Sequence, residues 1–159
     1  MNVRDPVRIG KGAAGAVVIL VLGACSPPAA SRLPSEALDT AIARRIGDPA
    51  TCVLIAERRT RRVVYRYGDD FNCVRGLPAC DRPGAMSARE ALALADAYQG
   101  RGASCASSPD GSRTVGWAEG RAVGARHELI YSAVMEGQTA LPGREIASRL
   151  AQAFAAAGL

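Results

Sequence analysis

The stretch Cys52-Val53-Leu54-Ile55-Ala56 is apolar throughout and decides the fold that we expect. A continuous apolar run of this length is typical of a strand that is buried on both faces of a sheet. Val63, Tyr65 and Tyr67 follow at alternate positions and predict a second strand with one buried face. The segment between the two runs is too short for a crossover connection, so we expect an antiparallel hairpin.

Three further segments have the apolar spacing of helices. The first begins at Ser35, a residue type that caps helix N-termini well. The second begins at Ser87-Ala88-Arg89-Glu90, a capping box in which the serine and glutamate side chains bond reciprocally to backbone N–H groups. The third begins near Pro142 and places an apolar residue at every fourth position as far as Phe154.

A second pair of strands is predicted at residues 114–119 and 128–135, joined by a loop that is long enough for a bulged hairpin. The element order is then helix, hairpin, helix, hairpin, helix (αββαββα). The economical way to pack these elements is an α+β domain, in which one four-stranded antiparallel sheet from two hairpins is covered by three helices. We expect a single domain of this kind over residues 35–159.

Cysteine usage predicts that the domain is held by covalent bridges. Four cysteines lie in it, namely Cys52, Cys73, Cys80 and Cys105. An even number in an exported chain indicates two disulfides. Of the three possible pairings we favour Cys73–Cys80, because the glycine and proline between them allow a tight loop, with Cys52–Cys105 as the long bridge. A zinc site with four cysteine ligands is the alternative, but no two cysteines have the short spacing that such sites favour. We expect no metal and no cofactor.

The N-terminal segment has the layout of an export signal. Arg4, Arg8 and Lys11 precede an apolar run of 12 residues from Ala13 to Ala24, which is the order of a positive region, an apolar region and a small-residue cleavage site. The run ends in Leu22-Gly23-Ala24-Cys25, where a cysteine directly follows two small residues. This arrangement resembles the lipobox of bacterial lipoproteins, and the resemblance covers only the first 25 residues.

The lipobox resemblance implies that Cys25 is lipidated and that residues 1–24 are removed. Residues 25–34, which are rich in proline, would then tether the domain to the bilayer. In this family an aspartate after the cysteine retains the protein at the inner membrane, so Ser26 favours the outer membrane, facing the periplasm. The alternatives are a plain signal peptide cleaved near Ala24 and a transmembrane helix, although spanning a bilayer takes about 20 residues.

The outline of the chain is loosely similar to that of penicillin-binding proteins and serine β-lactamases. The likeness consists of the hairpin at residues 52–67, the context Pro78-Ala79-Cys80, a late strand with a tryptophan and a C-terminal helix. Those enzymes use a serine three residues before a lysine, and no lysine follows Lys11 in this chain. The resemblance therefore implies an inactive relative, and a chance similarity of hairpins is the alternative.

Other candidate catalytic residues have simpler interpretations. His127 is the only histidine, so any catalytic triad would need it, and we interpret it as a polar residue at the start of a strand. Asp69 and Asp70 are interpreted as turn residues rather than an acid–base pair or a calcium site. Glu119 lies close to Trp117 but lacks the second acid that a glycosidase requires.

The most distinctive surface feature is a group of arginines between the first two predicted strands: Arg58, Arg59, Arg61 and Arg62. They predict a site for an anionic partner, which would be an anionic lipid, a cell-wall polymer or an acidic envelope protein. A solvated hairpin turn is the alternative. Removing residues 1–24 would leave a net charge of +3 of the formal +5, and an envelope location argues against nucleic acid as the partner.

The sequence as a whole predicts a lipoprotein of the outer membrane that acts as a non-catalytic binding or structural module. The acylated Cys25 would make the lipid bilayer its first partner. The alternative is a small envelope enzyme, or an inactive relative of the serine β-lactamases and transpeptidases.

Overall fold

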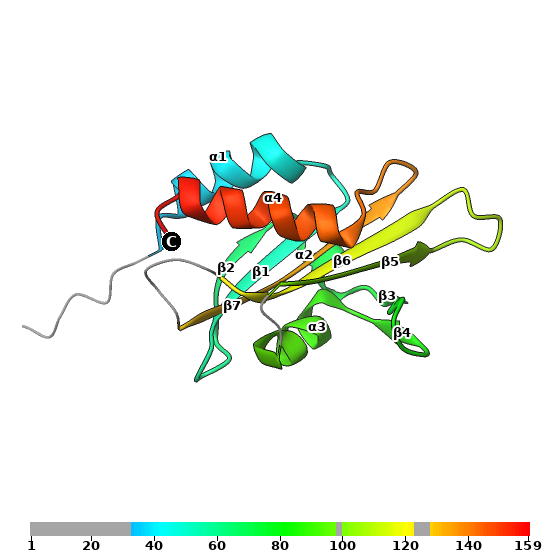
Figure 1. Ribbon diagram of the computed structural model, residues 1–159, viewed down its shortest axis with the longest axis horizontal. Coiled ribbons are helices and arrows are strands. Elements are labelled where there is room, and N and C mark those ends of the chain that lie inside the picture. The colour runs from blue at the N-terminus through cyan, green and yellow to red at the C-terminus, as the bar shows by residue number, and fades with distance from the viewer. Residues whose placement is uncertain (1–32, 98–99, 123–127) are drawn as a thin grey trace, which may run out of the picture. The chain divides into compact units, whose positions relative to one another are not determined.

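A computed structural model describes residues 33–97, 100–122 and 128–159 (Figure 1). The predicted signal peptide, Cys25 and most of the predicted tether lie outside the described residues, as does His127. Over the described ranges, no helix has both the length and the apolar composition needed to cross a bilayer.

The described residues form a central antiparallel sheet of five strands, in the spatial order β2-β1-β7-β6-β5 (Figure 1). The bounds of these strands are β1 (Thr51–Glu57), β2 (Val63–Tyr67), β5 (Arg101–Ala106), β6 (Thr114–Arg121) and β7 (Leu129–Gly137). A separate two-stranded ribbon pairs β3 (Leu77–Pro78) with β4 (Ala85–Met86). The late strand β7 lies between β1 and β6 and so joins the two hairpins into one sheet.

Helices cover both faces of the sheet. Their bounds are α1 (Ser35–Ile46), α2 (Asp70–Val74), α3 (Ala88–Leu94), the 3₁₀ turn η1 (Ala95–Ala97) and α4 (Gly143–Ala156). Figure 1 shows α1 and α4 on one face and α3 on the other. The capping box predicted for α3 is present, because the Glu90 side chain accepts from the Ser87 backbone N–H at 2.7 Å and the Ser87 side chain accepts from the Glu90 backbone N–H at 3.3 Å.

The prediction of a four-stranded sheet with three helices is wrong. The described residues contain the further strand β5 at an edge of the sheet, the small β3–β4 ribbon and the additional short helix α2. Strand β5 has the sequence RGASCA, whose small residues show no apolar alternation. It is a strand because its backbone pairs with β6 from Arg101 to Ala106. Here tertiary pairing outweighs the low strand propensity of the local sequence.

Strand β1 is buried on both faces, as its continuous apolar sequence predicts: the residues from Thr51 to Ala56 are all buried. Val53 and Ile55 belong to the core beneath α1 and α4. Leu54 belongs to a second core on the α3 face, which also contains Trp117. Successive side chains of a strand point to opposite faces, so this one segment contributes to both cores.

Glycines allow α4 to sit directly on the sheet. A Cβ atom on Gly116 of β6 would lie 2.1 Å from the Leu141 carbonyl oxygen, and one on Gly143 of α4 would lie 2.1 Å from the Trp117 carbonyl oxygen. Any larger residue would therefore have to displace backbone. The Gly143 N–H donates to Ser104 Oγ of β5 at 2.7 Å, which gives the first turn of α4 a partner on the edge strand.

The two ends of the sheet carry different features. Because β1 and β7 are antiparallel, Thr51 and Glu136 lie toward one end, whereas Glu57 and Leu129 lie at the other. Both disulfides are attached to strands near the first end, which we call the disulfide end. The β1–β2 turn projects from the second end, which we call the hairpin end (Figure 1).

Candidate anion-binding surface

The structure contains two disulfides, which confirms the number predicted from the cysteine count, but the preferred pairing is wrong. Cys52 is bonded to Cys73 and Cys80 to Cys105, each with a Cα–Cα separation of 5.3 Å. Cys73 is bonded to Cys52 and not to Cys80 because it lies in α2, a helix that packs against β1. These four thiols are all used in disulfides, so the alternative of a four-cysteine zinc site does not apply.

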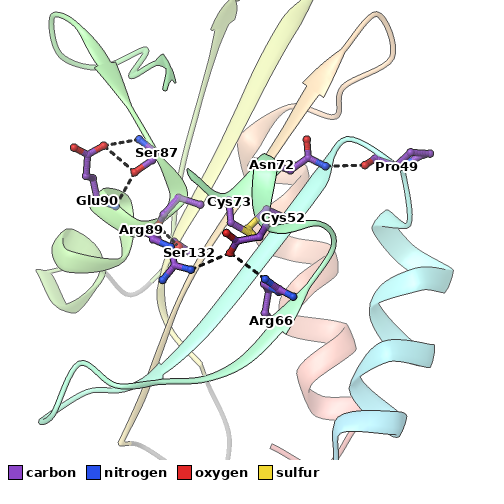
Figure 2. The surroundings of a disulfide bond; sticks show 11 residues. Pro49, Cys52, Arg66, Asn72, Cys73, Ser87, Arg89, Glu90 and Ser132 are labelled. Atoms are coloured by element: carbon purple, nitrogen blue, oxygen red, sulfur yellow. Dashed lines mark hydrogen bonds and ion pairs between the residues drawn. A yellow bond between two sulfur atoms is a disulfide. The ribbon is translucent and has the colours of Figure 1, made fainter. Parts of the chain in front are cut away.

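Figure 2 shows that the Cys52–Cys73 bridge is surrounded by structural contacts. The Asn72 side chain donates to the Pro49 carbonyl oxygen at 2.8 Å. Asp70 accepts from Arg66 at 2.9 Å and from Arg89 at 3.0 Å, and these hydrogen bonds lower the pKa of Asp70. Asp69 and Asp70, which the sequence predicts as turn residues, begin α2 instead, with Asp69 at its N-cap and Asp70 as its first residue.

The β1–β2 turn places Arg58 and Arg61 against Asp96, which belongs to η1. Arg58 Nε donates to Asp96 Oδ1 at 2.5 Å, and Arg61 Nη2 lies 3.4 Å from Oδ2. Arg121, at the end of β6, brings its Nε within 3.5 Å of Oδ1. The bond from Arg58 is the main reason why the pKa of Asp96 is lowered.

The other two arginines of the turn have fewer internal partners. Arg62 forms an ion pair with Glu57, which also accepts from Thr60 at 2.6 Å. Arg59 is exposed and makes no hydrogen bond or ion pair with any residue in the described part of the chain. Its guanidinium group is therefore available to a ligand.

Together these side chains form a surface with excess positive charge. We define the arginine surface as Arg58, Arg59, Arg61, Arg62 and Arg121. The carboxylates beside it in the described ranges are Glu57 and Asp96, together with Glu128, whose carbonyl accepts from the Arg58 N–H at 2.6 Å. Five arginines against three carboxylates leave a surplus of two positive charges.

The arginine side chains of this surface remain partly exposed to solvent. The exposed fractions of the side chains are 37% for Arg58, 44% for Arg61, 68% for Arg62 and 39% for Arg121. A guanidinium presents its N–H groups in a fork that matches the paired oxygens of a phosphate or carboxylate. The arrangement can therefore bind an anion without first breaking its contacts to Asp96 and Glu57.

The backbone of the turn is strained at Arg61, where φ is +59°. This left-handed conformation costs a residue with a side chain about 1 kcal/mol or more, and turns usually place glycine, asparagine or aspartate there. The Arg61 N–H donates to the Glu57 carbonyl at 2.9 Å, which holds the conformation. The strain thus occurs at a residue whose side chain is charged and reaches Asp96.

Two members of this site, Asp96 and Arg121, carry no signal in the sequence. Asp96 and Arg121 are remote in sequence from the turn. The pairing of β1 with β7 and of β7 with β6 brings Arg121 to it, and Asp96 arrives because η1 packs against β6 and β7. Arg121 also lines a cavity of about 270 Å³ beside α4, together with Arg144 and Ser148. Arg121 could be identified only from the register of the sheet and Asp96 only from the packing of η1 on it, and both are tertiary properties.

A second arginine–carboxylate cluster lies at the disulfide end, around Glu136. Arg113 binds both of its carboxylate oxygens, at 2.7 and 2.6 Å, and Ser107 Oγ donates at 2.7 Å. Arg75 Nη1 lies 3.2 Å from Oε2. The bonds from Arg113 are the main reason why the pKa of Glu136 falls to about 2. The Glu136 side chain is only 6% exposed, so this cluster links β7 to the surrounding loops and does not face a ligand.

Glu119 and Trp117 do not form a saccharide site. The Trp117 indole N–H donates to the Pro78 carbonyl at 2.7 Å, and the residue is 3% exposed. Burial raises the pKa of Glu119, and the charges of Arg101 and Arg82 partly oppose this rise. Both side chains are buried on the face of the sheet that α3 covers. In the described residues, no group of three or more His, Cys, Asp or Glu side chains is placed to hold a metal ion.

Comparison of the chain with protein-family models, with curated proteins and with solved structures finds no match.

Proposed function

We propose that this chain is a lipid-anchored protein of the bacterial cell envelope, at the outer membrane and facing the periplasm, and that it serves as a non-catalytic binding or structural module. The lipobox-like segment Leu22-Gly23-Ala24-Cys25 supports the anchor, with residues 1–24 as the removed signal peptide and residues 25–34 as the tether. The disulfides support an oxidising compartment, because such bonds are rare in the reducing cytosol.

The observation that carries the binding role is the surplus of positive charge at the arginine surface. Its guanidinium groups are partly exposed and are held in place by Asp96 and Glu57. Anionic lipid, an anionic cell-wall polymer and an acidic patch of an envelope protein are the partners that this chemistry fits. In the periplasm, nucleic acid is not an available partner.

The alternative of a small envelope enzyme or an inactive serine β-lactamase relative gains no support from the residues that carried it. Cys80 is bonded to Cys105, and Glu119 and Trp117 are buried. We expect purified protein to form no covalent adduct with a penicillin-type or fluorophosphonate probe. An adduct of stoichiometric mass would favour the enzyme instead.

The anchor is tested by replacing Cys25 with serine in the full chain. Cells that express the wild-type chain should incorporate a labelled fatty acid into the protein, whereas the Cys25→Ser variant should stay unlabelled and keep residues 1–24. The matched control is Ser26→Asp, which leaves the cysteine intact, so it should still be labelled but should fractionate with the inner membrane. Normal processing of Cys25→Ser would contradict the proposal.

A further inference from the structure

We propose that the hairpin end of the domain lies on the membrane that carries the anchor, and that the arginine surface binds the anionic phosphate groups of lipid head groups there. This inference rests on the proposed lipid anchor at Cys25 and adds an orientation and a ligand to it.

The first step concerns where the chain enters the domain. Thr51 Oγ1 donates to the Ile46 carbonyl at 3.1 Å, so the last turn of α1 lies beside the start of β1. Tyr65 Oη donates to Asp39 Oδ1 at 2.6 Å, and Tyr65 pairs with Ile55 near the end of β1. Helix α1 therefore runs back along the sheet, and its first residues lie toward the hairpin end. Figure 1 shows the start of α1 and the β1–β2 turn at the same end of the sheet.

The second step concerns the length of the tether. Residues 25–32 connect the proposed acylated cysteine to Leu33, and eight residues span at most about 30 Å when fully extended. Since Leu33 packs against the core under α1, the hairpin end is the part of the domain that the anchor holds nearest to the bilayer. Attraction between exposed charges is largely screened beyond about 8 Å at physiological ionic strength, so this proximity is what lets the arginines act on lipid.

The third step concerns the chemistry of the surface. Arg59 makes no hydrogen bond or ion pair within the described ranges, and Arg62 is 68% exposed, so both can donate to phosphate oxygens. Two exposed large apolar side chains are adjacent in sequence to members of this site: Val63 follows Arg62 and is 36% exposed, and Leu94 precedes η1 and is 37% exposed. Basic residues flanked by exposed apolar ones are typical of segments that lie at a membrane interface. A polymer or protein partner would not require the surface to lie at the anchored end, whereas a bilayer does.

A lipid chain combined with a basic patch is a recognised way to make membrane attachment stable and to set its orientation. Acyl chains hold the N-terminus alone, and the tether leaves the domain free to rotate. Contacts from the arginine surface would fix the hairpin end against the head groups. The disulfide end would then project into the periplasm.

The experiment measures which arginines the bilayer protects. The full-length, processed protein is reconstituted into vesicles of phosphatidylcholine alone or of phosphatidylcholine with phosphatidylglycerol. It is treated with an arginine-specific dicarbonyl reagent, and labelling is quantified for each peptide by mass spectrometry. Arg44 is the internal control, because it is exposed and lies in the last turn of α1, toward the disulfide end.

We expect labelling of Arg59 and Arg62 to fall about fivefold in the anionic vesicles, which is the factor by which an anionic surface favours one nearby arginine. Labelling of Arg44 should be the same in both vesicles, and the protection should weaken with added salt. The variant Arg59→Glu should reduce the protection of Arg62, whereas Arg44→Glu should not.

Equal labelling of Arg59 in both vesicles, with the protein still acylated and vesicle-bound, would overturn the inference and leave the anchor intact. Protection in intact envelopes but not on anionic vesicles would also overturn it and would assign the surface to a polymer or protein. A Cys25 peptide without acyl mass would overturn the proposed function, and the inference with it.

Discussion

Asp96 and Glu136 are both surrounded by arginines, yet the two clusters differ in how much of their charge stays exposed to solvent. At the disulfide end, Glu136 has both oxygens bound by Arg113 and is 6% exposed. At the hairpin end, the Asp96 side chain is 29% exposed, and the arginines that approach it are 37 to 44% exposed. The same residue types thus form a closed structural contact in one place and an open surface in the other. Solvent exposure and the balance of donors to acceptors decide which role a charged cluster can have.

The largest effect on stability should come from removing a disulfide. Replacing both Cys52 and Cys73 with alanine should lower the free energy of unfolding by about 4 kcal/mol, of which about 3 kcal/mol is the entropy of a loop of this length. Urea unfolding measures the loss. Cys80 and Cys105 close a loop of similar length but are only partly buried, so a dithiol reductant should open their bridge first. Preferential reduction of Cys52–Cys73 would contradict this account.

The buried carboxylate of Glu136 should give the next largest effect on stability. Glu136→Gln removes the charge that Arg113 and Arg75 face, and we expect the free energy of unfolding at pH 7 to fall by about 2 kcal/mol, because Arg113 is itself 46% exposed and solvent screens the pair. The control Glu145→Gln removes an exposed carboxylate on α4 that pairs with Arg149, and it should leave the urea midpoint nearly unchanged.

The same carboxylate predicts a pH dependence of stability. The pKa of Glu136 is lowered from 4.5 to about 2 by folding, so the unfolded chain binds the proton more tightly than the folded chain does. The stabilisation is therefore complete above about pH 5 and is lost as the pH falls through 4.5 toward 2. Urea midpoints of wild type and Glu136→Gln should converge over this interval. An undiminished difference at pH 2 would show that Glu136 is not the group responsible.

The cluster around Asp96 at the hairpin end should contribute much less to stability. Asp96→Asn leaves Arg58, Arg61 and Arg121 without their shared carboxylate, but these side chains can turn into solvent. We expect a shift in the urea midpoint well below that of Glu136→Gln, together with an increase in binding to anionic vesicles, because the surface gains one net positive charge. A loss of stability equal to that of Glu136→Gln would show that the two clusters have the same structural role.

The smallest effect on stability is expected at the turn itself. Arg61→Gly removes the cost of a side chain at φ +59° but increases the entropy lost on folding. These terms are similar in size, so the free energy of unfolding should change by less than about 0.5 kcal/mol. Arg59→Gly is the control, because Arg59 lacks a positive φ and the same change there brings no relief of strain. A greater loss of stability at Arg61 than at Arg59 would contradict this account.

The parts of the fold that could be predicted are those that local sequence patterns determine, and the parts that could not are those that tertiary contacts determine. The β1–β2 hairpin could be predicted because Cys52–Ala56 is continuously apolar and Tyr65 and Tyr67 alternate, and both patterns are local. The prediction that Val63 shares their buried face is wrong, because a bulge shifts the register between Ile55 and Ala56 and leaves Val63 exposed. Strand β5 could not, since Arg101–Ala106 consists mostly of small residues and forms a strand through its pairing with β6. The missing strand is the main reason why the predicted sheet is too small.

The candidate site shows the same division. The arginines of the turn could be recognised as a basic surface, because four of them fall within five consecutive residues. Their partner Asp96 and the fifth arginine, Arg121, could not, since the packing of η1 on the sheet brings the first there and the sheet register brings the second. Similarly, the cysteine count predicts two disulfides, but their pairing depends on α2 packing against β1.

The account depends most on the covalent state of the N-terminus, because only an anchored chain gives the hairpin end a membrane to face. The direct measurement is the mass of the N-terminal peptide from the native protein. We predict a peptide that begins at Cys25 and carries the added mass of acyl chains. A peptide that begins at Met1, or an unmodified Cys25, would contradict the account.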